Sequence, residues 1–243
     1  MMLTQNKNFT YTTTGKKEIS VAKAFIANVF SWMFLALIIT AATAYFFASD
    51  PKLINSLYNT QTGGMSTLGW VVMLLPFGFV LLMSYGFNKL SAGVLSMLFI
   101  AFAILLGMSL SFILLVYTQS SIALTFIVAA TMFGIMAVTG YTTKIDLTKF
   151  GSLMMMGLIG IIIASLLNFF MKSSTLEYII SFIGVLVFTG LTAYDVQKLK
   201  RIGSGIEFGS NTARKLTIMG ALTLYLDFIN LFLFLLRFLG NRK

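Results

Sequence analysis

Cysteine and histidine are absent from all 243 residues of the sequence. Without cysteine the chain has no disulfides, no thiol chemistry and no thiolate ligands for a metal. Without histidine it has no imidazole for metal binding or for acid–base catalysis near neutral pH. Any metal site must therefore be built from oxygen ligands, and we expect neither an enzyme nor a bound cofactor.

Charged residues are also scarce. They make up 10% of the chain, whereas soluble domains typically contain about 25%. Hydrophobic residues make up 58%, and the mean hydropathy is +0.93. Because about 20 consecutive apolar residues cross a bilayer, this composition indicates an all-α polytopic membrane protein surrounded by lipid. The net charge of +10 is then explained by topology signals and anionic lipid head groups, and we expect no nucleic-acid partner.

Seven apolar segments are long enough to span a membrane, and they leave no soluble domain. They cover residues 23–48, 67–87, 91–117, 121–141, 147–171, 175–200 and 215–240. Residues 1–22 lack the apolar core of a signal peptide, so we expect them to be a polar N-terminal tail, and we expect residues 23–243 to form a single transmembrane domain. The Asp50-Pro51 pair is expected to end the first helix, and Pro76 is expected to kink the second.

Small residues recur at intervals of four in three segments. Such stripes let helix backbones approach closely in lipid, so we interpret them as packing seams. The stripes are Ala36, Thr40, Ala44 and Ala48; Ala103, Gly107 and Ser111; and Gly160, Ala164 and Asn168.

The distribution of lysine and arginine indicates the orientation in the membrane. With a cytoplasmic N-terminus, twelve of the 17 basic residues face the cytoplasm and five face the other side. The positive-inside rule therefore favours a cytoplasmic N-terminus and an external C-terminus. The basic C-terminus, with Arg242 and Lys243, argues mildly for a re-entrant last segment that returns this end to the cytoplasm.

The linker between the last two segments, RIGSGIEFGSNTARK, is rich in glycine and serine. It lacks the GxxxxGK[ST] spacing of a phosphate-binding loop and has no preceding strand, so we interpret it as a flexible cytoplasmic loop. Ser210, Asn211 or Thr212 is expected to cap the last helix.

Each of the last two segments carries a carboxylate: Asp195 in the sixth and Asp227 in the seventh. A carboxylate near the bilayer centre costs roughly 2.5 to 3.5 kcal/mol on insertion scales, so it is rarely kept without a task. Alternatively, Asp195 is an interfacial residue paired with Lys198 or with a loop residue, and Asp227 forms a structural polar lock with Asn230 or Tyr225.

Helical spacing places a few polar residues near the two aspartates. Thr192 lies three residues before Asp195, and Thr223 and Asn230 flank Asp227 at four and three residues. We predict that these residues form a polar face turned toward the bundle interior. Since consecutive segments form a helical hairpin, the two aspartates are expected to lie at similar depth.

Two adjacent carboxylates cannot both ionise comfortably, so the pair is expected to share one proton. Such a pair suits cation coordination, proton relay or intramembrane aspartyl proteolysis. Proteolysis is the least favoured, because Asp227 lies in LYLDF and not in GxGD, and no proline follows Pro76. Weak calcium binding by Asp195 and Asp227 is the expected metal chemistry.

The sequence resembles the Bax inhibitor family, also called transmembrane Bax inhibitor motif proteins. The resemblance rests on FTGLTAYDVQKLKRI and ALTLYLDFINLFLFLLR, supported by GMSLSFILLVYT and GYTTKIDLTKFG. It implies seven helices, six of them around the C-terminal one, and it places the paired aspartates of the family at Asp195 and Asp227. Some members latch this pair with a basic residue from the second helix, but here that segment has no lysine or arginine before Lys89.

The resemblance to bacterial members implies a multi-pass protein of the inner membrane and a pH-sensitive calcium leak. Our leading hypothesis is therefore a passive cation leak, with calcium as the ion, gated by a proton shared between Asp195 and Asp227. The alternative is a non-conducting regulator that binds other membrane proteins, as a protease modulator or a suppressor of cell death.

Overall fold

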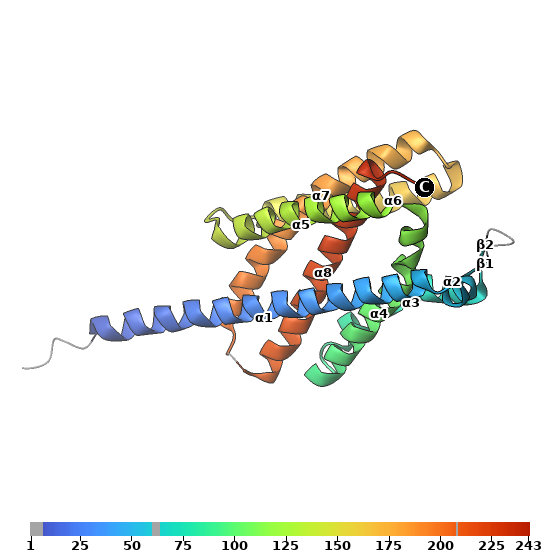
Figure 1. Cartoon of the computed structure of the whole chain (residues 1–243). Helices are drawn as coiled ribbons and strands as arrows, with labels where there is room; N and C mark the ends of the chain where they lie inside the picture. The colour runs from blue at the N-terminus through green and yellow to red at the C-terminus, as the bar shows by residue number, and fades with distance from the viewer. Residues whose placement is uncertain (1–6, 60–63, 208) are drawn as a thin grey trace, which may run out of the picture.

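The computed structural model describes residues 7–59, 64–207 and 209–243, and almost all of them are helical (Figure 1). Among these residues, seven helices are long and apolar enough to cross a membrane, which confirms the predicted polytopic bundle. They are α1 (Lys7–Ser49), α3 (Thr67–Gly86), α4 (Ala92–Val116), α5 (Gln119–Thr142), α6 (Thr148–Met171), α7 (Ser174–Gly205) and α8 (Asn211–Leu239). The short helix α2 (Pro51–Leu57) and the hairpin of β1 (Tyr58–Asn59) and β2 (Gly64–Met65) connect α1 to α3.

Hydroxyl side chains cap most of the membrane helices, as polar N-caps do in general. A serine or threonine oxygen accepts a backbone N–H of the first turn in five of them, and the capping residues are Ser66, Ser91, Thr118, Ser173 and Ser210. Ser210 confirms the predicted cap of the last helix. Asp50 ends α1 as expected and caps α2 by accepting the N–H of Lys52 at 2.8 Å.

Two segments are more helical than the sequence suggested. Helix α1 already begins at Lys7, so the predicted polar tail is helical from there, while residues 1–6 lie outside the described residues. Helix α7 continues through Ser204 to Gly205, so the interpretation of residues 201–215 as one flexible loop is wrong. Helical glycine costs roughly 1 kcal/mol, but the absence of a side chain at Gly203 lets α7 pack directly against Ala22 and Phe25 of α1.

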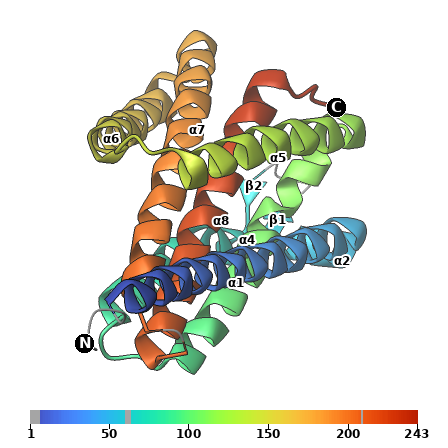
Figure 2. The same cartoon turned by 90° about the vertical axis from the view of Figure 1, so that its left-hand side faces the viewer.

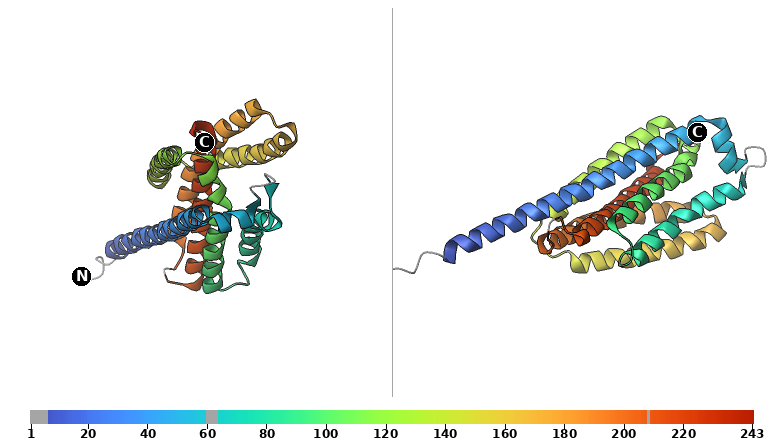
Figure 3. Two further views of the ribbon diagram at one scale, coloured as in Figure 1. Left: turned by 45° about the vertical axis from the view of Figure 1, so that its right-hand side comes forward. Right: turned by 90° about the horizontal axis from the view of Figure 1, so that it is seen from below.

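Helices α7 and α8 are the most buried of the seven. Helix α8 packs against α1, α4, α5 and α7 and lies at the centre of the bundle, as predicted (Figure 2). The six other helices do not form an even ring around it, because α3 packs mainly on α4 and α6 packs mainly on α7. In the right-hand view of Figure 3, α6 and α1 lie along opposite edges of the molecule.

The small-residue stripes of α1 and α4 pack against each other, which confirms their interpretation as seams. A Cβ atom at Gly107 would lie 2.6 Å from the backbone oxygen of Thr40 and 2.8 Å from the Thr43 Cβ, so the helices touch backbone to backbone. The stripe predicted on α6 is a seam only in part: Ala164 is half-buried and packs on the core, but Gly160 is exposed with open space around it, and the buried residues of α6 are Gly151 and Ile161. Spacing alone did not indicate which face of α6 meets α7.

The C-terminal residues are bound to the turn between α4 and α5. The backbone of Thr118 donates to the carbonyl of Asn241 at 3.2 Å, and Lys243 donates to the carbonyl of Val116 at 2.8 Å. Arg242 pairs with Glu177 at the start of α7 at 3.4 Å. Helix α8 therefore runs unbroken from the α7–α8 linker to the opposite end of the bundle, and the re-entrant alternative is wrong.

Candidate functional site: a buried aspartate pair

Asp195 of α7 and Asp227 of α8 meet at the interface between the two most buried helices. Their side chains lie within hydrogen-bonding reach of each other. The exposed fractions are 9% for Asp195 and 5% for Asp227, so both carboxyl groups are removed from the surface of the protein. The predicted depth match is therefore observed.

The packing of α7 against its neighbours fixes the position of Asp195. Helix α5 crosses α7 at Gly140, where a Cβ atom would overlap the backbone carbonyl of Ala193, two residues before Asp195. On the α8 side, a Cβ atom at Gly220 would meet the Leu199 side chain at 2.6 Å. Glycines thus bring the backbones of α5 and α8 against α7 close to the aspartate pair.

Asp227 is the more isolated of the two carboxyls. Within the described part of the chain, its Oδ2 atom is the one buried side-chain oxygen or nitrogen without a hydrogen-bond partner. An ionised carboxylate can only accept hydrogen bonds, so two carboxylates can bond to each other only when one carries a proton. An ionised pair would be costly at this position unless a cation or a proton compensates its charge.

The predicted polar face does not surround the pair. The hydroxyls of Thr192 and Thr223 donate to the carbonyls of Phe188 and Met219 at 2.8 and 3.1 Å, one turn back on their own helices. The Asn230 amide donates in the same way to Leu226 at 2.8 Å. Thr223 is also exposed, so the prediction of a polar stripe facing the interior is wrong there. Bonding to the carbonyl one turn back, common for helical threonine, satisfies these groups locally.

The two structural alternatives for the aspartates are wrong. Lys198 acts on Asp195 only at longer range, and its ammonium lies 5.9 Å from the centre of the Tyr194 ring; the described residues contain no ion pair between it and Asp195. Asn230 is bound to its own helix, and Tyr225 bonds to Thr40 at 2.6 Å. Neither locks Asp227.

A basic latch from the second membrane helix is absent, in line with its sequence. Helix α3 contains no lysine or arginine, and it packs on α4 at the outside of the bundle. The carboxyl pair therefore faces no base from this helix.

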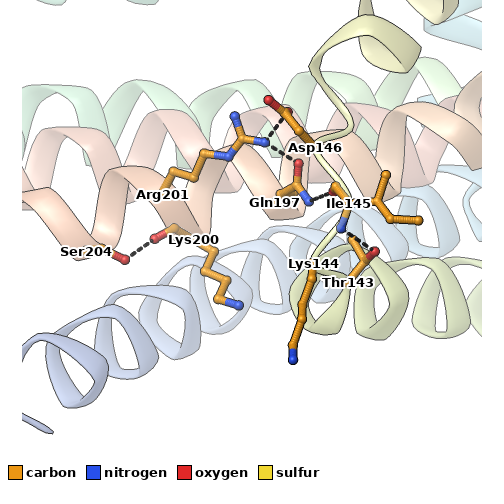
Figure 4. Close-up of a pocket in the computed structure, with 8 residues that line it drawn as sticks. All are labelled: Thr143, Lys144, Ile145, Asp146, Gln197, Lys200, Arg201 and Ser204. Carbon is orange, nitrogen blue, oxygen red and sulfur yellow. Dashed lines mark hydrogen bonds and ion pairs between the residues drawn. The ribbon is translucent and has the colours of Figure 1, made fainter. Parts of the chain in front are cut away.

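A polar cluster that sequence reasoning missed lies further along α7. The amide of Gln197 donates to the carbonyl of Ile145 at 2.7 Å and accepts the N–H of Leu147 at 2.9 Å, which fixes the α5–α6 turn to α7. Arg201 donates to both Gln197 and Asp146 (Figure 4). The available signal was a glutamine two residues after Asp195 in an apolar segment. The structure buries this residue to 6% exposure, and its partners are some 50 residues away in the sequence.

The chemistry open to the aspartate pair is limited by its few ligands. The described residues contain no cluster of three or more acidic, histidine or cysteine side chains. Calcium takes six to eight oxygen ligands, so two carboxyl groups could hold it only weakly, with water or backbone oxygens completing the shell. The pair is therefore better suited to exchanging a proton for a transiently bound cation than to binding a cation tightly.

By its fold and its site, this protein is a polytopic membrane protein: a bundle of seven helices with a buried carboxyl pair between α7 and α8. Its sequence matches the family described as "Inhibitor of apoptosis-promoting Bax1" over residues 22–243, and the chain belongs to this Bax inhibitor family, as predicted.

The relatives are bacterial. The chain is 47% identical over 222 residues to the inner membrane protein YbhL of Escherichia coli strain K12, covering 91% of this chain and 93% of that protein. It is 43% identical over 242 residues to the uncharacterized protein RP147 of Rickettsia prowazekii, covering the full length of both. It is 34% identical over 220 residues to the uncharacterized protein YrjE of Lactococcus lactis. The chain is therefore an integral multi-pass membrane protein with relatives in the bacterial inner membrane.

Proposed function

We propose that the protein is a pH-sensitive cation leak of the bacterial inner membrane, with calcium as the permeating ion. Asp195 and Asp227 form its gate. The observation that carries this proposal is the burial of two adjacent carboxyl groups, one of which has an oxygen without a hydrogen-bond partner. Such a site is incomplete until it takes up a proton or a cation.

The direction of the pH response follows from the charge of the pair. At low pH one shared proton joins the two carboxyls, reduces their charge and holds α7 against α8, which is the closed state. At higher pH the proton leaves, the two negative charges repel, and the helices separate or admit a cation. Cation flux should therefore rise with pH, and protons and calcium should compete for the site.

Calcium flux into liposomes containing the purified protein tests this proposal. The rate is measured from pH 5 to 8 for the wild type, Asp195→Asn, Asp227→Asn and the double variant. Each asparagine keeps the shape of the side chain but removes one titration, so each single variant should flatten the pH profile. The double variant should add little, because the two residues act as one unit.

Asp50→Asn is the matched control, since it also removes one carboxylate but keeps a residue that can cap α2. Its pH profile should equal that of the wild type. No calcium flux through the wild type, or an unaltered pH profile in both single variants, would contradict a gate at Asp195 and Asp227. Strictly additive effects would do the same.

A further inference from the structure

We propose that the cavity between the α5–α6 turn and the C-terminal part of α7 binds the phosphate group of an anionic ligand. The cavity has a volume of about 350 Å³. Its lining residues come from two stretches, Thr143–Asp146 in the turn and Gln197–Ser204 on α7 (Figure 4). This site is separate from the aspartate pair, and the proposal does not depend on the function assigned to that pair.

The charge of the cavity is unbalanced in favour of anions. Three lining residues are basic, namely Lys144, Lys200 and Arg201, while Asp146 is the one acidic side chain. Asp146 already pairs with Arg201 at 2.5 Å. Among the described residues neither lysine forms an ion pair, so two positive charges stay uncompensated around one cavity.

The wall of the cavity is held in place by its own hydrogen bonds. Gln197 bonds to the backbone on both sides of Asp146, and Arg201 reaches across to the same turn. The Lys200 ammonium donates to the carbonyl of Tyr141 at 2.7 Å and lies 4.8 Å from the centre of the Tyr141 ring. An ammonium group has three N–H donors, so Lys200 keeps two for a ligand in a position that is already fixed.

The second lysine completes the site. In Figure 4 the Lys144 side chain extends from the turn toward the same side as the Lys200 ammonium. Two lysines match the charge of a phosphate monoester, which carries between one and two negative charges at pH 7, better than that of a single carboxylate. Compact lysine charges suit the several oxygens of a phosphate, and charge-assisted hydrogen bonds are about twice as strong as neutral ones.

The position of the cavity leaves two sources for this group. Tyr141 and Lys200 belong to the spans Gln119–Thr142 and Ser174–Gly205, while Lys144 lies just beyond the end of α5. The cavity is therefore at the boundary of the membrane-spanning region, where both the head group of an anionic phospholipid and a soluble phosphate compound can reach it.

Ligand-induced shifts of thermal unfolding, measured on the full chain in a neutral detergent, test the proposal. The probes are inorganic phosphate, dihexanoyl phosphatidic acid, and dihexanoyl phosphatidylcholine as the lipid without net charge. Lys144→Gln/Lys200→Gln should weaken binding of phosphatidic acid by about tenfold or more, because two charge-assisted hydrogen bonds are lost. Lys89→Gln/Lys149→Gln removes two exposed lysines from the same end of the bundle and should leave binding unchanged.

The outcomes distinguish the two sources of the phosphate group from each other, and both of them from a general attraction of anions to exposed lysines. Binding of phosphatidic acid alone identifies a lipid head group, and binding of inorganic phosphate as well identifies a site for the phosphate group itself; both support the proposal. Equal weakening in the two double variants, or no binding of either anion, would overturn it. Lys200→Arg retains the charge and should retain binding. If the cavity double variant fails to fold, Lys144→Gln alone should still weaken binding several-fold, and unchanged affinity would refute the site.

Discussion

The hydroxyl groups of Tyr225 on α8 and Thr40 on α1 lie 2.6 Å apart in the buried centre of the bundle. Thr40 also donates to the carbonyl of Ala103 on α4 at 3.0 Å, so Tyr225 must supply the proton of the bond between the two hydroxyls. The Tyr225 ring packs edge-on against Phe99 and Phe102 of α4 at 5.8 and 5.7 Å. One polar contact thus joins three helices, two residues along α8 from Asp227.

This direction of donation predicts unequal costs for removing the two hydroxyls. Tyr225→Phe leaves Thr40 bonded to Ala103 and should lower the free energy of unfolding by about 1 kcal/mol. Thr40→Val leaves a buried tyrosine hydroxyl without a partner and should cost about 1–3 kcal/mol. The double variant should be no worse than Thr40→Val alone. Unfolding in detergent measures all three, and a larger loss for Tyr225→Phe than for Thr40→Val would refute the assignment.

The contact between α1 and α4 predicts a strong effect for the smallest possible substitution. Gly107→Ala places a methyl group against the backbone of Thr40, so the two helices must move apart and the protein should unfold at a clearly lower temperature. Gly160→Ala is the matched control on α6, where the added methyl group meets open space. It should be neutral or slightly stabilising, because alanine favours helix. Similar losses in both variants would show that helix flexibility, not packing, is being measured.

The ion pair between Asp146 and Arg201 in the α5–α6 turn predicts that the charge of Asp146 does not change with pH in the neutral range. The Thr148 hydroxyl and the Arg201 guanidinium hold the pKa of Asp146 well below its ordinary value of 3.8. Because the folded-state pKa is lowered, the contribution of Asp146 to stability is fully present above pH 3.8 and is lost only as pH falls toward the folded pKa. Titration of the four aspartates by selective carbon-13 labelling should show no change at Asp146 between pH 8 and 5.

Arg201→Gln should shift the pKa of Asp146 upward but not fully to its ordinary value, since Thr148 still donates to the carboxylate. Arg214→Gln, which removes a base from the same end of the bundle, should leave that pKa unchanged. An Asp146 titration in the neutral range of the wild type would contradict the ion pair.

Calcium binding should depend on the two aspartates but not on the polar residues once expected to assist them. Affinity should fall from pH 8 to pH 5, because protons and calcium compete for the same carboxyl oxygens. Thr223→Val should leave calcium affinity unchanged, because the Thr223 hydroxyl is bonded to Met219. Isothermal titration in detergent checks both points. Equal or tighter binding at pH 5 would exclude a carboxylate site.

The distribution of basic residues predicts a cytoplasmic location for the turn between α5 and α6. Because the chain has no cysteine, single cysteines report sidedness without a background. In intact cells, Lys144→Cys and Ser204→Cys should be shielded from an impermeant thiol reagent, while Lys52→Cys at the opposite end should react. Reaction at Lys144→Cys with protection at Lys52→Cys would reverse the orientation.

Hydropathy and helix-end signals predicted much of this fold. Seven spans follow from the apolar segments, and the end of α1 follows from Asp50-Pro51, because these signals are local. The adjacency of Asp195 and Asp227 was also predictable, since antiparallel neighbours in a hairpin meet at comparable depth.

The remaining errors concern which partner each helix face meets. Thr223 and Gly160 follow the right spacing, but both are exposed, because spacing defines a face and not its neighbour. Gly203 was assigned to a loop, but it is helical and packs against α1, a contact between residues far apart in the sequence. The bonds of Gln197 and Arg201 to the α5–α6 turn join residues about 50 positions apart, beyond the reach of local patterns.

The ribosome makes the central helix of the bundle, α8, after the six other membrane helices that the structure describes. Tyr225 follows Thr40 by 185 residues, so the hydroxyl of Thr40 lacks this hydrogen-bond partner until α8 has been synthesised. Until then α1, α4, α5 and α7 lack the helix that they all contact, and the C-terminal residues that close the α4–α5 turn come later still. A chain that stops before α8 therefore leaves the buried surfaces of these four helices without the partner that they share.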